Sequence, residues 1–187
     1  MTAARTYLPP ISPDTVPGDT PVAAMLDFIR AASGGRLLNM HLQMAAAPLV
    51  LDQYTSLRRA IGANAAMEDR VRAAVAVAAS AAGNGEYTLA VNAMLARRVG
   101  WTAEQVTAIT EGRSCGDASI DALLEIVREA AGGDGTVSDV AWSAATDAGW
   151  TAVDLTETYG YLALVTFCDR FVRYARTDFD LGFAAAG

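Results

Sequence analysis

The segment from Asn84 to Asn92 holds the polar side chains whose types and spacing are best suited to chemistry. Gly85, Thr88 and Asn92 stand at the i, i+3 and i+7 positions of one helical face. Glu86 falls in the first turn of that helix, where the helix dipole favours a charged carboxylate. A carboxylate can accept a proton, while the Thr88 hydroxyl and the Asn92 amide can hydrogen-bond to a developing oxyanion. This spacing therefore indicates acid–base chemistry, with Glu86 as the acid/base.

Three ring side chains are predicted helpers of this site: Tyr87, Tyr54 and His41. His41 is the only histidine of the chain, so a metal site built from several histidines is excluded. Its apolar neighbours Leu38, Met40 and Leu42 can lower the pKa of the imidazole. Two roles stay open for His41, a buried structural residue or a general base.

Other motifs have simpler explanations than chemistry. The Gly112–Gly116 segment matches the G-x-S-x-G pattern of serine hydrolases, but a helix precedes it where the motif needs a strand, so we expect a flexible loop. The turn at 132–135 is not followed by Lys-Ser/Thr and is no phosphate loop. Cys115 and Cys168 lie far apart in sequence and are expected to be reduced, buried thiols. We therefore predict no metal and no cofactor.

Composition narrows the class of protein and of partner. Hydrophobic residues make up 52% of the 187 residues but aromatic ones only 7%, so small apolar side chains dominate, and alanine favours helix. The formal charge of −7 opposes binding to nucleic acid or to anionic membranes. The most apolar stretch, 73–82, is about half of the ~20 residues that span a bilayer, and the N-terminus has no apolar signal region. We expect a cytoplasmic, all-α protein.

Signals in the sequence for the start and the end of a helix predict the elements that position these residues. Five of the six prolines fall within the first 21 residues, which predicts an extended arm over 1–21. The helical pattern begins at Val22 and predicts one all-α domain over 22–181, and a flexible tail is expected at 182–187. Helices are predicted over these ranges: 22–33, 37–46, 49–61, 67–82, 86–99, 103–111, 119–131, 139–148 and 152–176. The sequence Gly-Trp-Thr-Ala opens two of them, at Gly100 and at Gly149, either as a helix corner used twice or as the mark of a degenerate helical repeat.

The segment Asn84-Gly-Glu-Tyr-Thr-Leu-Ala-Val-Asn92, with Ala-Arg-Arg-Val-Gly after it, resembles the core of the alkylhydroperoxidase D (AhpD)/carboxymuconolactone decarboxylase superfamily. The family pattern there is Asn-Gly-Cys-Glu-Tyr-Cys, a histidine four residues on, and an Ala-Arg-Arg-x-Gly helix end. Gly35-Arg-Leu-Leu-Asn39, Pro48 and Asp169-Arg-Phe171 also resemble family features. The similarity covers roughly residues 20–181 and implies an AhpD-like helical bundle.

The departures from the family are as informative as the matches. Peroxidases of the family use two cysteines, a histidine and a glutamate, and the corresponding positions here are Gly85, Thr88, Asn92 and Ala73. The C-x-x-C motif is thus degenerate, and without a thiolate there is no nucleophile toward peroxide. Gly85, Ala73 and Tyr54 are expected to line a substrate pocket instead.

Two functions from different classes follow from these residues and from the resemblance. The first is a cofactor-independent acid–base enzyme, of decarboxylase, isomerase, lyase or cyclase type, acting on a small organic molecule. The second is a non-catalytic member that binds a small molecule or serves as a structural subunit. Homo-oligomerisation is expected for both, because members of the family assemble through their helical faces.

Overall fold

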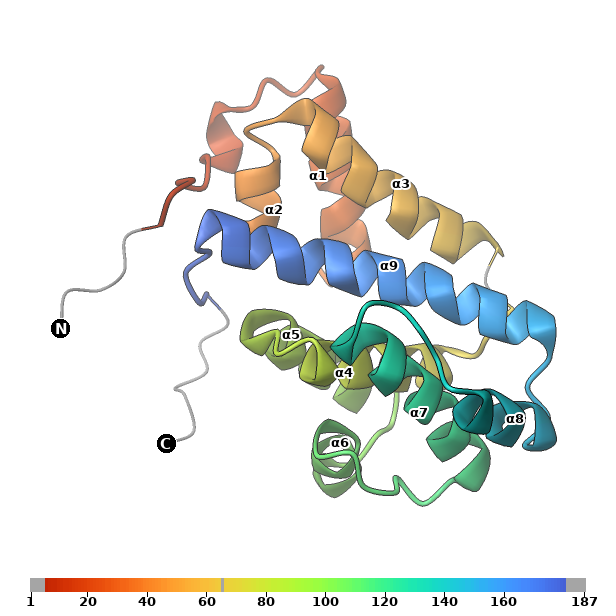
Figure 1. The fold of residues 1–187 in the computed structure, drawn as a ribbon. Coiled ribbons are helices and arrows are strands. Elements are labelled where there is room, and N and C mark those ends of the chain that lie inside the picture. Colours follow the sequence, from red (N-terminus) through yellow and green to blue (C-terminus); the bar gives the residue numbers. More distant parts are fainter. Residues whose placement is uncertain (1–5, 65, 181–187) are drawn as a thin grey trace, which may run out of the picture. The chain divides into compact units, whose positions relative to one another are not determined.

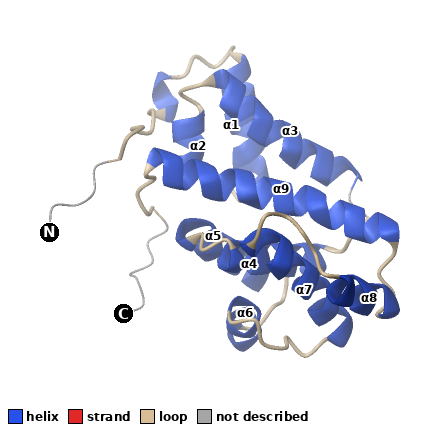
Figure 2. Cartoon of the chain, in the orientation of Figure 1, coloured by secondary structure: helices blue, strands red, loops and turns tan. Residues whose placement is uncertain are grey.

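Alanine-rich apolar segments form helices throughout the part of the chain that the structure describes. The computed structural model covers residues 6–64 and 66–180, which contain nine α-helices, one 3-10 turn and no strand (Figures 1 and 2). The predicted all-α class is confirmed. No helix within these two ranges is long and apolar enough to cross a membrane. The predicted tail at 182–187 and the first five residues of the arm lie outside the described residues.

Contacts divide the chain into two compact units, and the predicted arm, helical domain and tail stay a prediction. Among the described residues, the first unit comprises 6–60 and 170–180, and the second comprises 61–64 and 66–169. The first contains a 3-10 turn, three helices and the end of a fourth: η1 (Pro13–Thr15), α1 (Pro21–Ala32), α2 (Asn39–Met44), most of α3 (Pro48–Asn64) and the end of α9 (Ala152–Ala175). Pro48 begins α3, a position where its missing N–H would have no helical partner.

The proline-rich arm is held against the first unit by hydrogen bonds. Tyr7 donates its backbone N–H to the carbonyl oxygen of Ala175 at 3.0 Å, and Ile11 donates to Leu42 at 3.3 Å. The buried amide of Gln43 donates to the carbonyl oxygen of Leu8 at 2.6 Å. Burying an amide without hydrogen-bond partners costs free energy. The bonds that Gln43 makes to the arm therefore stabilise the arm against the rest of the first unit.

The second unit is built around α4. Its helices are α4 (Asp69–Ala82), α5 (Glu86–Arg98), α6 (Ala103–Thr110), α7 (Ala118–Gly132), α8 (Asp139–Asp147) and α9 up to residue 169. Helix α4 packs against α5, α6 and α7, and α7 packs against α8 (Figure 1). Alanine and valine dominate the buried face of α4, so neighbouring helices can approach it closely.

The second unit contains an internal repeat with an offset of 49 residues. Gly100 and Gly149 both have φ of 98°, a left-handed conformation that favours glycine. The tryptophan after each glycine donates its indole N–H to a carbonyl oxygen 31 residues upstream, Trp101 to Arg70 and Trp150 to Ser119, at 2.8 Å in both cases. The helices before the two corners also correspond, α4 with α7 and α5 with α8. These matches favour the degenerate helical repeat, rather than the alternative that one type of helix corner is simply used twice.

Candidate active site

The turn between α4 and α5 positions the residues that the sequence singles out. Asn84 takes a left-handed conformation with φ of 55°, and the N–H of Gly85 donates to the carbonyl oxygen of Ser80 at 2.8 Å. This pattern closes the C-terminus of α4 and satisfies a carbonyl that would otherwise lack a partner. Helix α5 then begins at Glu86, as predicted, so the next side chains follow at helical spacing.

A buried carboxylate from α9 occupies the centre of this turn. Thr88 is 3% exposed, and its hydroxyl donates a hydrogen bond to Asp169, which is also 3% exposed. The Thr88 hydroxyl oxygen also lies 3.0 Å from the carbonyl oxygen of Gly85. A side chain at position 85 would begin 2.5 Å from the Thr88 hydroxyl and would overlap the carboxylate of Asp169. Glycine at position 85 is therefore required by the close approach of Asp169.

Asn92 lies one helical turn beyond Thr88 and faces α4. Its amide nitrogen donates to the hydroxyl of Ser80 at 2.9 Å and lies 3.5 Å from the carbonyl oxygen of Ala76. Asn92 is half-buried, whereas Ser80 is fully buried. Two polar pairs therefore lie along the start of α5, Thr88 with Asp169 and Asn92 with Ser80.

The remaining predicted residues of the second unit have different environments. Glu86 is exposed at the first position of α5. Tyr87 is buried, at 4% exposure. Ala73 is half-buried on α4 and packs against the hydrophobic core of the unit. Among these three, only Glu86 presents an ionisable group to solvent.

His41 and Tyr54 form a buried pair within the first unit. The Nδ1 atom of His41 accepts the backbone N–H of Leu38 at 3.1 Å, and Nε2 lies 3.1 Å from the hydroxyl of Tyr54. Because Nδ1 is an acceptor, the proton of the neutral ring is on Nε2, which donates to Tyr54. Burial, together with the charge of Arg58, lowers the pKa of His41 from 6.5 to about 3. The ring is therefore neutral at pH 7, and its bond to Leu38 helps to begin α2.

No set of residues that would hold a metal is found in the described ranges. Within residues 6–64 and 66–180, no three His, Cys, Asp or Glu side chains gather as metal ligands would. Cofactor-independence stays a prediction.

Comparisons with known proteins bear on the fold. No protein-family model and no curated protein matches the sequence. Among solved structures, a peroxidase-related protein from Ralstonia eutropha JMP134, described as an alkylhydroperoxidase AhpD core, shares 14% identity at a TM-score of 0.81, over 94% of this chain and 93% of that one. The chain has the AhpD fold.

Two further structures share this AhpD fold. A variant of the debrominase Bmp8 in complex with 2,3,4-tribromopyrrole aligns at a TM-score of 0.80 and 17% identity, over 95% of this chain and 93% of that one. A peroxidase-related protein from Silicibacter sp. TM1040 aligns at 0.76 and 12% identity, over 98% of both chains. The resemblance found in the sequence is thus matched by the fold of the whole chain.

Asp169 is the buried acid beside Thr88 that the sequence pattern did not place at the candidate site. In the sequence it is part of the Asp-Arg-Phe motif of the last helix. A signal was present, because Leu162, Val165 and Asp169 recur at helical spacing and all three are buried. A charged residue on an apolar stripe of a helix needs a buried partner, and Thr88 supplies one.

Proposed function

We propose that this chain is a divergent AhpD-fold enzyme without thiol peroxidase chemistry, which moves a proton on a small organic substrate. The observation that carries the proposal is the buried Thr88–Asp169 pair, in which Thr88 stands at one of the two positions where the resemblance expects cysteines and Asp169 lies against the other, Gly85. A carboxylate hydrogen-bonded to a hydroxyl is a unit for proton transfer. Asp169 is then the base in place of the predicted Glu86, because Glu86 is exposed and Asp169 is buried beside Thr88.

The chemistry follows from the two polar pairs. The Asp169 carboxylate would accept a proton from a carbon next to a carbonyl group. The Thr88 hydroxyl, no longer facing a negative charge, would then turn to the oxyanion that develops on the substrate. Asn92 is half-buried, and its amide would help to hold the same oxyanion.

The environment of the two cysteines supports a function without thiol chemistry. Both are buried thiols that form no disulfide. Burial, together with the nearby Asp121, raises the pKa of the Cys115 thiol above its usual range. A thiol with a raised pKa holds little thiolate at pH 7 and is a poor nucleophile toward peroxide.

A non-catalytic role is the second candidate, and the environments of Glu86 and His41 favour it. Glu86 is exposed, and both ring nitrogens of His41 are occupied by partners within the protein. Such groups suit a structural role or the binding of a small molecule. The Bmp8 structure contains a small halogenated pyrrole, which supports a small organic ligand for either candidate.

Exchange of deuterium into a panel of small molecules separates the two candidates. The panel holds small carboxylates, enolisable ketones and halogenated pyrroles, and proton NMR follows the exchange. We expect at least one carbonyl compound to exchange, and Asp169→Asn to slow that exchange by about 100-fold or more. The exposed Asp147→Asn is the matched control and should exchange at the wild-type rate.

Two results would count against the enzyme. One is an exchange rate that Asp169→Asn leaves unchanged. The other is a compound that raises the melting temperature of the protein but is never exchanged, which would favour the non-catalytic candidate. Reduction of an organic peroxide by the wild-type protein would overturn the absence of thiol peroxidase chemistry.

A further inference from the structure

The two tryptophan corners of the internal repeat differ in what covers the indole ring. In the first corner the guanidinium of Arg70 lies 4.0 Å from the centre of the Trp101 ring, and Trp101 is 2% exposed. In the second corner the residue that corresponds to Arg70 is Ser119, which has no positive charge. Trp150 is correspondingly half-buried. The second corner thus has the same indole and the same backbone bond, but it lacks the cation.

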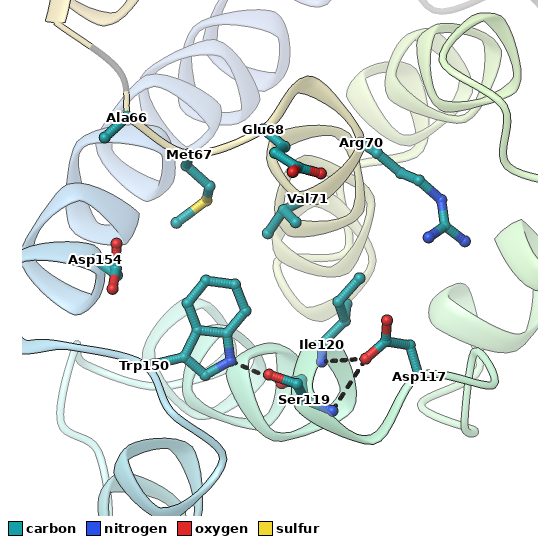
Figure 3. Close-up of a pocket in the computed structure, with 10 residues that line it drawn as sticks. All are labelled: Ala66, Met67, Glu68, Arg70, Val71, Asp117, Ser119, Ile120, Trp150 and Asp154. Atoms are coloured by element: carbon teal, nitrogen blue, oxygen red, sulfur yellow. Dashed lines mark hydrogen bonds between the residues drawn. The ribbon is translucent and has the colours of Figure 1, made fainter.

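A pocket lies beside the second corner, and both Trp150 and Ser119 line it. Its volume is about 370 Å³, within the range of small-molecule sites. Figure 3 shows the six-membered ring of Trp150 directed toward Met67 inside this pocket. Val71 and Ile120 add apolar surface beside the ring. The pocket lies within the second unit and is separate from the Thr88–Asp169 pair.

The charged residues of the pocket are mostly acidic. Glu68, Asp117 and Asp154 line it, and Figure 3 shows Asp154 and Asp117 on opposite sides of Trp150. Hydrogen bonds from the hydroxyl and the backbone N–H of Thr151 lower the pKa of Asp154, so this carboxylate is charged at pH 7. Arg70 is the one basic residue among those that line the pocket, and its guanidinium lies over Trp101.

An anion is a poor match for this pocket, although two helices begin beside it. Asp117 accepts the N–H groups of Ser119 and Ile120 at 3.1 Å, so its carboxylate already occupies the N-terminus of α7. Glu68 stands at the N-cap of α4. Carboxylates at both helix starts would repel a second anion.

We infer that this pocket binds a small organic cation, a guanidinium or an alkylammonium, which lies against the indole of Trp150 in the way that Arg70 lies over Trp101. An aromatic ring attracts a cation to its face, and nearby carboxylates add to the attraction. The inference does not depend on the Thr88–Asp169 pair, so its failure would leave the proposed enzyme untouched.

The test compares a cation with its neutral counterpart. Ethylguanidinium and N-ethylurea have similar size and shape but differ in charge. We expect ethylguanidinium to shift the NMR signal of the Trp150 indole N–H and to bind about tenfold tighter than N-ethylurea. Methylphosphonate should not bind. Equal affinity for the two probes, or preference for methylphosphonate, would overturn the inference.

Variants of this chain locate the binding site. Ser119→Arg places in the second corner the cation that the first corner has, so it should abolish the binding of ethylguanidinium. Trp150→Leu should weaken binding about tenfold or more, whereas Trp142→Leu, on α8 and 46% exposed, should not change it. If Trp150→Leu does not fold, Ser119→Arg still decides, because undiminished binding in that variant would place the cation elsewhere.

Discussion

The Asp169 carboxylate determines what position 85 can hold. It lies against Gly85 and accepts the hydroxyl hydrogen of Thr88, so the space that a side chain at 85 would need is already filled. A buried carboxylate is tolerated only with hydrogen-bond partners, and Thr88 is one such partner. Glycine at position 85 and an acid at position 169 therefore belong to one packing arrangement, because the carboxylate fills the space that a side chain at 85 would need.

This arrangement predicts that Gly85→Ala is strongly destabilising. The new methyl group would overlap Asp169, so the variant should lose about 1–3 kcal/mol of unfolding free energy. Urea denaturation measures the loss. Gly18→Ala is the matched control, since no atom lies within 4 Å of a side chain there, and it should lose far less. Equal stability of the two variants would show that Asp169 does not fill the space beside Gly85.

The single histidine predicts a defined dependence of stability on pH. His41 has a pKa of about 3 in the folded protein against 6.5 ordinarily, so the unfolded chain binds one more proton between these values. The contribution of the neutral His41 to the free energy of unfolding is therefore fully present above about pH 6.5, and it decreases as the pH falls toward 3. From pH 7 to pH 5 the loss should be about 2 kcal/mol.

Urea denaturation at pH 7 and pH 5 measures this loss. The comparison variant is His41→Gln, whose amide oxygen can still accept the N–H of Leu38 but does not titrate. It should lose little stability between the two pH values. The pKa values of Asp121, Asp134 and Asp154 are also lowered. These carboxyl groups change the stability only below this window, near pH 4 and under. The same pH dependence in both proteins would contradict a neutral, buried His41.

At the scale of elements, four helices begin at a side-chain cap of the type that the sequence favours: α1, α6, α7 and α8. A capping box begins α6, with Thr102 accepting the N–H of Gln105 at 3.2 Å and Gln105 accepting that of Thr102 at 3.1 Å. Thr102→Ala should therefore cost about 1 kcal/mol. Thr107→Ala, on the exposed side of the same helix, should cost less than about 0.5 kcal/mol. Thermal melting of both variants tests the cap, and equal melting temperatures would show that it contributes nothing.

These local signals explain how much of the fold could be predicted. The helix that follows each cap was predicted within one or two residues, for example α8 after Ser138, because caps act over a single turn. The partnership of Thr88 with Asp169 was not predicted, since it joins residues 81 positions apart. The pocket beside Trp150 was missed for the same reason: its walls come from the starts of α4, α7 and α9. Helical spacing identifies a face of a helix but not what lies against that face.

At the scale of the whole molecule, the charge and the exposed apolar side chains govern association. The formal charge of −7 opposes binding to nucleic acid, which stays a prediction together with the cytoplasmic location. Several large apolar side chains are nonetheless exposed by more than two thirds of their surface: Leu49, Val140, Val153, Tyr159 and Tyr174. Exposed apolar side chains favour association between protein chains where they gather into one patch.

Homo-oligomerisation, which the family resemblance implies, is the prediction that belongs to this scale. Sedimentation equilibrium should give a mass that is a multiple of the 19.5 kDa chain and that decreases on dilution. Because the exposed side chains named above carry no charge, added salt should not lower this mass, as it would for an association made by ion pairs. A mass of one chain at every concentration would contradict the prediction, and dissociation by salt would show that charged residues hold the copies together.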